Sequence, residues 1–280
     1  MLHIHHVSCT TVGIILKVFM KEQIYKCNGI SINYMEYCNE HEPMLLLHGA
    51  TNRWQSFMPI IPDLSKNYHI YALDFRGHGT SQRAKNYTLD DYLSDAYSFI
   101  KERIKKPVII IGHSLGGMIG ILLAAYYPEL VKQLVIIDTP LTLQSLQRLS
   151  AGPMDHANWL IQGLRYSQLV PGLPLPEGLG QCDPEMLLAM VNQFDKTFAP
   201  YKERELFSKI KCPLLLVRGS IELGSLINEV DLKATLKLIP HMVHTKIAHT
   251  GHSPIRNDPH AVIEAIKSFL QPLGNKTVQI

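Results

Sequence analysis

Hydrophobic and polar positions alternate near the beginning of the chain, in two short segments that flank an Asn-Gly pair. The segments are residues 23–26 and 30–37, and Asn28-Gly29 lies between them. Alternation with a period of two is typical of a β-strand with one buried face. Because Asn-Gly is the strongest two-residue signal for a tight turn between strands, the pattern predicts an antiparallel hairpin.

Further along the chain, short apolar runs alternate with longer segments of helical character. The runs predict buried strands at residues 43–47, 70–73, 108–111, 133–137, 212–219 and 244–248. The segments between them predict helices at residues 54–64, 88–105, 115–127, 225–233 and 259–270. The second of these helices begins with a capping sequence, Thr88-Leu89-Asp90-Asp91. Alternating strands and helices imply right-handed crossovers and a parallel sheet covered on both faces.

One segment, residues 141–207, interrupts this alternation. It contains Leu- and Met-rich helical patches and a proline- and glycine-rich stretch at 171–178, which together predict an inserted cap of short helices. The expected organisation is a core formed by residues 20–139 and 208–280 and a cap formed by residues 140–207. Five aromatic residues of the cap could line a pocket or simply pack the cap onto the core: Trp159, Tyr166, Phe194, Phe198 and Tyr201.

Residues 1–19 precede the predicted hairpin and are expected to be a tail or an upstream extension. Their apolar stretch, residues 12–20, is interrupted by Lys17 and is far shorter than the roughly 20 residues that a membrane-spanning helix needs. No small-residue cleavage site follows it, so a signal peptide is the weaker alternative. We therefore expect no membrane span.

Composition narrows the class of protein. The 280 residues carry a net charge of +3 without a basic block, so nucleic acid is not an expected partner. The five cysteines are an odd number and include no C-x-x-C pair, which argues against a disulfide framework and a zinc site and favours a reducing, cytoplasmic setting. Because no metal-ligand motif or phosphate-binding loop is present, we expect no metal and no cofactor.

The candidate chemistry centres on Gly112-His113-Ser114-Leu115-Gly116, which fits the G-x-S-x-G nucleophile elbow between a strand and a helix. In such a turn a Cβ atom at either glycine would collide with a neighbouring element, while the serine hydroxyl projects into a cleft. A serine hydroxyl becomes a good nucleophile when an imidazole takes its proton, and the imidazole needs a carboxylate to hold its tautomer.

Fourteen histidines compete for the role of the base. His48 and His113 follow or end predicted strands and are expected to orient loops by hydrogen bonding. His252 alone follows a glycine and precedes a Ser-Pro turn and a helix, a context that presents a side chain on a loop above the sheet. We therefore favour His252 as the base, with His249 as its main rival.

Four motifs, taken together and in this order, resemble the α/β-hydrolase family over residues 20–270: His48-Gly49, Asp74-x-Arg76-Gly77-x-Gly79-x-Ser81, Gly112-x-Ser114-x-Gly116, and Gly251-His252-Ser253-Pro254. The resemblance implies a mostly parallel central sheet with helices on both faces and an inserted helical cap. It implies that Ser114 is the nucleophile and His252 the base, and that the backbone N–H groups of Ala50 and Leu115 form the oxyanion hole. Serine in place of aspartate disfavours the haloalkane-dehalogenase and epoxide-hydrolase branches.

The resemblance leaves two candidates for the acid. Members of the family place it after the strand that follows the elbow helix, here Asp138, or after the next core strand, here Glu222. The later strand is the more usual, but aspartate is the more usual residue. We favour Asp138 with Glu222 as the alternative, and expect Asp74 to hold its own loop by pairing with Arg76.

The resulting hypothesis is a cofactor-independent, carboxylesterase-like serine hydrolase that cleaves a small or medium carboxylic ester through an acyl-enzyme. The same triad could act on an amide, a lactone, a thioester or a carbon–carbon bond. A hydrolase-fold ligand receptor with little turnover is the alternative from a different class. The expected partner is a small-molecule substrate, and the oligomeric state is left open.

Overall fold

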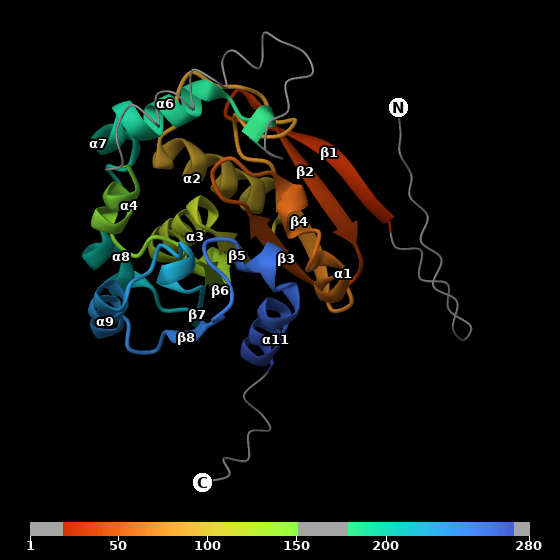
Figure 1. Ribbon diagram of the computed structural model, residues 1–280. Helices are drawn as coiled ribbons and strands as arrows, with labels where there is room; N and C mark the ends of the chain where they lie inside the picture. Colours follow the sequence, from red (N-terminus) through yellow and green to blue (C-terminus); the bar gives the residue numbers. More distant parts are fainter. Residues whose placement is uncertain (1–18, 151–178, 272–280) are drawn as a thin grey trace.

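The structure is a computed structural model that describes residues 19–150 and 179–271 (Figure 1). Three segments lie outside the described residues: residues 1–18 of the predicted tail, residues 151–178 of the predicted cap, and residues 272–280. Within the described part, one sheet contains eight strands in the order β1-β2-β4-β3-β5-β6-β7-β8. The strands are β1 (Phe19–Cys27), β2 (Ile30–Cys38), β3 (Glu42–Leu47), β4 (Tyr68–Leu73), β5 (Val108–His113), β6 (Val131–Ile137), β7 (Leu214–Arg218) and β8 (Val243–Lys246).

The predicted hairpin is confirmed. β1 and β2 pair antiparallel with Cys27 opposite Ile30. Asn28 and Gly29 both have positive φ, 49° and 72°, as the tightest hairpin turn requires. β1 begins at Phe19, four residues before the predicted start.

The remaining pairings give a mostly parallel sheet, as predicted. β2 pairs antiparallel with β4, and from β4 through β3, β5, β6 and β7 to β8 every neighbouring pair is parallel. The carboxyl ends of β3 to β8 therefore meet at one edge of the sheet, the edge at which open α/β sheets place their ligands.

Helices cover both faces of this sheet. The α-helices are α1 (Ile61–Leu64), α2 (Leu89–Ser98), α3 (Leu115–Tyr126), α4 (Leu143–Ser150), α6 (Pro184–Asn192), α7 (Phe194–Thr197), α8 (Glu203–Lys209), α9 (Glu229–Leu238), α10 (Pro254–Asn257) and α11 (Pro259–Leu270). α1 and α11 lie on one side of the sheet, whereas α2 and α3 lie on the other (Figure 1). No helix within residues 19–150 or 179–271 has the length and apolar character needed to cross a bilayer.

Alternate strand residues feed two separate hydrophobic cores. In β3, Met44 and Leu46 pack with the residues of α1 and α11, while Leu45 and Leu47 pack with those of α2 and α3. All four side chains are fully buried. Burial on both faces explains why the parallel strands read in the sequence as continuous apolar runs.

Two of the predicted helices are each divided into two shorter elements in the structure. The segment 54–64 forms a short 3₁₀ turn, η1 (Trp54–Phe57), and then α1, because Pro59 and Pro62 cannot donate the hydrogen bonds of one continuous helix. The segment 88–105 forms α2 and then a π-helical turn, η2 (Phe99–Ile104). The predicted cap of α2 is confirmed, since Thr88 and Asp91 form a reciprocal capping box.

The segment between β6 and β7 is helical where it is described. It contains α4, a short turn η4 (Leu179–Gln181), α6, α7 and α8. Phe198 and Tyr201 are buried at 3% and 1% exposure, and the Tyr201 hydroxyl donates to the Pro140 carbonyl at 2.8 Å. These two aromatic residues therefore pack this segment onto the core. Trp159 and Tyr166 lie outside the described residues.

Candidate active site

Ser114 lies at the tip of the sharp turn between β5 and α3. Its backbone has φ 51° and ψ −115°, a conformation that costs a non-glycine residue about 1–3 kcal/mol. A Cβ atom at Gly112 would lie 2.4 Å from the Gly116 carbonyl oxygen, and one at Gly116 would lie 1.9 Å from the Leu47 carbonyl oxygen. The steric reason predicted for these two glycines is confirmed.

The turn brings the predicted oxyanion-hole segments close to Ser114. Leu115 is the first residue of α3, and the first N–H groups of a helix have no acceptor within the helix. Gly49 packs against the turn so closely that a Cβ atom there would lie 3.1 Å from the Ser114 Cβ, and Ala50 is the next residue. Ser114 itself is partly exposed between buried neighbours, His113 and Leu115.

Asp138 and His252 are joined by a hydrogen bond above the carboxyl edge of the sheet. His252 Nδ1 lies 2.7 Å from Asp138 Oδ2, although 114 residues separate them in the chain. The Asp138 side chain is fully buried directly after β6, and the His252 side chain is 36% exposed on the loop after β8. The pair therefore couples a buried carboxylate to an imidazole that solutes can reach.

Three further groups donate to the Asp138 carboxylate. They are the Ser225 hydroxyl at 2.5 Å, the Leu226 N–H at 3.0 Å and the Gly219 N–H at 3.3 Å. Burial by itself would raise the pKa of Asp138, but the hydrogen bonds from His252 and Ser225 outweigh it and hold the pKa below its ordinary value. Asp138 is therefore ionised at neutral pH.

The hydrogen bonds of Ser225 and Leu226 with Asp138 shift the start of one predicted helix. The two candidate acids also lie in different surroundings. The helix predicted at 225–233 begins instead at Glu229, because Ser225 and Leu226 turn toward Asp138. Glu222 lies on a short exposed turn, η5 (Ile221–Leu223), and among the described residues it makes no hydrogen bond with His252. The structure brings Asp138 to His252 and leaves Glu222 in solvent, as it leaves the rival base His249.

His113 connects the serine turn to the histidine loop. Its Nε2 lies 2.7 Å from the His252 carbonyl oxygen, and the two rings are 4.9 Å apart. Burial, together with the nearby His252, lowers the pKa of His113 to about 4. The neutral ring places its one N–H on Nε2 and donates it to the His252 backbone, which confirms the predicted loop-orienting role.

With this geometry established, the comparison with known proteins decides the family. Residues 42–200, more than half of the chain, match the alpha/beta hydrolase fold family. The chain belongs to this family. The chain is 27% identical over 248 residues to the 2-(acetamidomethylene)succinate hydrolase of Mesorhizobium japonicum, a match that covers 81% of this chain and 87% of that protein.

Two other relatives extend the comparison. The chain is 34% identical to epoxide hydrolase 4 of Homo sapiens over 119 residues, 41% of this chain, and the match spans only 33% of that protein. The solved structure of the enol-lactonase from Burkholderia xenovorans LB400 superposes with a TM-score of 0.71 at 16% identity, over 89% of this chain and 99% of that one. The latter likeness supports the fold.

One predicted contact, between Asp74 and Arg76, is wrong. Asp74 does not pair with Arg76, whose guanidinium instead contacts Asp95 at 2.7 Å and Asp91 at 2.8 Å on α2. The Asp74 carboxylate accepts hydrogen bonds from the Trp54 N–H at 2.7 Å and from the Asn33 side chain at 2.8 Å. Asp74 therefore does hold the loops around it, but through neutral donors.

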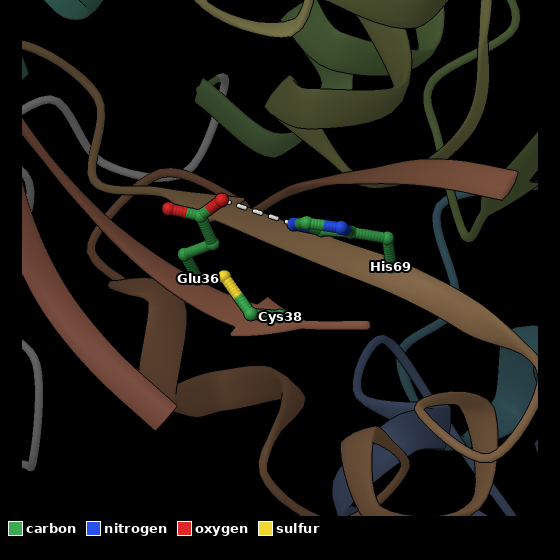
Figure 2. A group of neighbouring side chains, drawn as sticks. All are labelled: Glu36, Cys38 and His69. Carbon is green, nitrogen blue, oxygen red and sulfur yellow. Dashed lines mark hydrogen bonds and ion pairs between the residues drawn. The ribbon is translucent and has the colours of Figure 1, made fainter. Parts of the chain in front are cut away.

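The structure also contains a cluster of metal-ligand residue types that the sequence analysis missed. Among the described residues, Glu36, Cys38 and His69 bring one ligand atom each to within 4.8 Å of the others (Figure 2). Glu36 and Cys38 point to the same face of β2, and the pairing of Tyr37 with Ile70 brings β4 alongside. The cluster lies at the amino end of β4, the opposite end from Asp74.

The charges of this cluster fit an ion-pair network better than a metal site. His69 Nε2 lies 3.0 Å from Glu36 Oε1 (Figure 2). On the other carboxylate oxygen, Arg103 Nη2 lies 2.6 Å from Glu36 Oε2. Burial opposes the ionisation of Glu36, but the His69 hydrogen bond and the Arg103 charge lower its pKa to about 2. A divalent cation here would have to break the hydrogen bond between His69 and Glu36 and would face the positive charge of Arg103.

Proposed function

We propose that this protein is a cofactor-independent serine hydrolase, carboxylesterase-like, that cleaves a small or medium carboxylic ester through an acyl-enzyme. The observation that carries the proposal is the Asp138–His252 hydrogen bond beside the strained turn of Ser114. Nucleophile, acid and base then occur in the chain order Ser-Asp-His that is usual for α/β hydrolases.

The protonation states support this assignment of roles. An ionised Asp138 can only accept, so His252 carries its proton on Nδ1 and keeps the Nε2 lone pair for the Ser114 hydroxyl. Ser114 Oγ would attack the carbonyl carbon as its proton moves to Nε2. The oxyanion would accept hydrogen bonds from the N–H groups of Ala50 and Leu115.

The remaining steps balance without a cofactor. The tetrahedral intermediate would expel the alcohol, which takes the proton from His252 Nε2. Water would then attack the acyl-enzyme, give a proton to His252, and release the carboxylic acid and the Ser114 hydroxyl. Among the described contacts Ser114 and His252 share no hydrogen bond, and such bonds often tighten only when the substrate is bound.

A second candidate bond is an amide-like one, because the relative from Mesorhizobium japonicum that matches 81% of this chain is named for an acetamidomethylene substrate. The same three side chains would serve, with an amine as the leaving group. The likeness to epoxide hydrolase 4 gives less support for an epoxide substrate, since it covers 41% of this chain and Ser114 is suited to acyl transfer. A cytoplasmic location stays a prediction.

The test combines activity with direct labelling of the nucleophile. We expect p-nitrophenyl esters of graded chain length to be hydrolysed and a fluorophosphonate probe to label Ser114. Ser114→Ala should lose activity by about a millionfold and abolish labelling, whereas Ser208→Ala, at an exposed serine of α8, should do neither. Labelling with negligible steady-state turnover would favour the receptor alternative, and unchanged activity in Ser114→Ala would refute the nucleophile.

A further inference from the structure

The proposed acid, Asp138, has a strained backbone and a side chain that is closed off from solvent. Its φ of 42° is positive, a conformation that costs a residue other than glycine about 1–3 kcal/mol. Because the side chain has no exposed surface, bulk water cannot fix the direction of its carboxylate. Protein groups must therefore hold the carboxylate in the orientation that serves His252.

Four donors hold the Asp138 carboxylate, two on each oxygen. Oδ2 accepts from His252 Nδ1 at 2.7 Å and from the Leu226 N–H at 3.0 Å. Oδ1 accepts from the Ser225 hydroxyl at 2.5 Å and from the Gly219 N–H at 3.3 Å. An ionised carboxylate offers about four lone pairs, so these donors use its full capacity. On the oxygen that does not face His252, Ser225 is the nearer of the two donors.

Ser225 is itself held so that its hydroxyl proton points to Asp138. Gly224 ends η5 with a φ of 91°, a conformation that favours glycine, and the Ser225 N–H then donates to the Ser220 carbonyl at 3.1 Å. The Ser225 hydroxyl oxygen accepts from the Ile227 N–H at 3.3 Å, which leaves its own proton for Oδ1 of Asp138. The side chain is only 3% exposed, so little solvent competes for this bond.

The residue type matters more at Ser225 than at the other two donors on its loop. Gly219 and Leu226 donate backbone N–H groups, which do not depend on a side chain. Ser225 alone of the three donates through its side chain. The loop after β7, which also carries the alternative acid Glu222, thus supplies a hydroxyl to the carboxylate that follows β6.

We propose that Ser225 is a positioning residue of the hydrolytic reaction. It holds Oδ1 of Asp138 so that Oδ2 stays on His252 Nδ1 while the imidazole gains and loses a proton. The proposal rests on the proposed hydrolase function of Ser114, His252 and Asp138. Without the hydroxyl, the carboxylate could turn about its Cβ–Cγ bond and release the ring, and a misplacement of about 1 Å can cost about a hundredfold in rate.

The first test is a double-mutant cycle that measures kcat and KM on a p-nitrophenyl ester. Ser225→Ala should lower kcat about tenfold or more and leave KM within about twofold, because the buried hydroxyl acts on the orientation of the acid. In the Asp138→Asn background the same substitution should change kcat less than about twofold, since the carboxylate through which it acts is gone. Equal losses in both backgrounds would overturn the proposal.

Two further variants separate positioning from packing. Ser81→Ala removes another buried hydroxyl, which donates at 2.6 Å to the backbone carbonyl of Asp74, and it should change kcat by the same factor in both backgrounds. Ser225→Cys keeps nearly the volume of the side chain but donates only weakly, so it should lower kcat as Ser225→Ala does. Full activity in Ser225→Cys would show that the side chain merely fills space, against the proposal.

A spectroscopic measurement keeps this proposal separate from the hydrolase function. In Ser114→Ala protein, the Nδ1 proton that His252 donates to Asp138 should give a downfield proton resonance in the NMR spectrum, assigned by its absence in His252→Gln. Adding Ser225→Ala should broaden or remove this resonance through exchange with water, whereas adding Ser81→Ala should retain it. A resonance that Ser225→Ala leaves unchanged would refute the positioning role. If Ser225→Ala removes the resonance but the fluorophosphonate probe does not label Ser114 in the wild type, the hydrolase function fails and the hold of Ser225 on Asp138 stands.

Discussion

Two aspartates occupy equivalent places at the carboxyl edge of the sheet but have opposite electrostatic surroundings. Asp74 directly follows β4 and Asp138 directly follows β6, and both are almost completely buried. Burial is the largest influence on each. It raises the pKa of Asp74, because the hydrogen bonds from Trp54, Asn33 and others compensate only in part. The pKa of Asp138 is lowered, with His252 the main opposing influence.

The difference between the two sites is the imidazole of His252, which is hydrogen-bonded to the carboxylate of Asp138. The hydrogen bonds to Asp74 come from backbone N–H groups and an amide, which cannot pass a proton on. His78 lies close enough to influence the pKa of Asp74 but forms no hydrogen bond with it among the described contacts. Asp138 receives similar neutral donors from Ser225 and Leu226 and, in addition, the ring of His252. A buried carboxylate at a strand end thus holds loops together in either case, and it gains a chemical role where a titratable partner faces it.

The largest expected effect is on turnover and comes from removing the charge of Asp138. Asp138→Asn should reduce turnover by about ten-thousandfold, because the amide can present an N–H to His252 Nδ1 and hold the wrong tautomer. Circular dichroism should show an unchanged fold. The measurement is kcat on a p-nitrophenyl ester with each variant.

Asp74→Asn is the matched control for this substitution, since it makes the same chemical change at a strand end that does not face His252. It should keep activity within about tenfold of the wild type, because Asp74 holds the loops of Trp54, Asn33 and Thr80 and makes no hydrogen bond with His252 among the described contacts. If both substitutions reduced turnover equally, the contrast between the two sites would be wrong.

The sequence predicts the fold well because its strongest signals are local. The apolar runs indicate strands that are buried on both faces, and Asn28-Gly29 indicates the hairpin turn. It could not decide between Asp138 and Glu222. That choice depends on the path of the loop after β7, where Ser225 and Leu226 turn inward to Asp138, and no local pattern encodes such a long-range contact.

The cluster of Glu36, Cys38 and His69 escaped the sequence analysis for a related reason. The alternation Glu36-x-Cys38 places two side chains on one face of a strand, and this could have been noticed. The third member comes from β4, which neighbours β2 although β3 lies between them in the chain. Spacing along the sequence therefore gave no sign of the cluster.

The next largest effect is on the free energy of unfolding and comes from substituting Asp74. Asp74→Asn should lower the free energy of unfolding by about 1–3 kcal/mol, since the new NH₂ group faces N–H donors of Trp54, Asn33 or Thr80 whichever way it turns. Urea unfolding at neutral pH measures the difference. A variant as stable as the wild type would show that these donors find other acceptors.

The opposite pKa directions predict opposite responses to acid. Ionised Asp138 stabilises the folded state above the pKa that it has in the unfolded chain, and this stabilisation is lost as pH falls through its lower folded-state pKa. Ionised Asp74 opposes folding above its raised folded-state pKa, and this penalty disappears as pH falls. As pH falls from about 5 to about 3, the difference in unfolding free energy between the wild type and Asp138→Asn should become smaller. Over the same range, the difference between the wild type and Asp74→Asn should become larger. Urea titrations at several pH values check this, and changes of the same sign would contradict it.

The smallest expected effect concerns the acid that the sequence could not exclude. Glu222 is exposed on η5, and its carboxylate makes no contact with His252 among the described residues. Glu222→Gln should therefore change unfolding free energy by no more than about 0.5 kcal/mol, the usual range for surface substitutions. Turnover should stay within about twofold of the wild type, because one exposed charge acts weakly through solvent. If Glu222→Gln were inactive and Asp138→Asn active, the loop after β7 would have to rearrange during catalysis so that Glu222 replaced Asp138 beside His252. The assignments of Ser114 and His252 would survive that result, whereas the proposed division of roles between Asp74 and Asp138 would not.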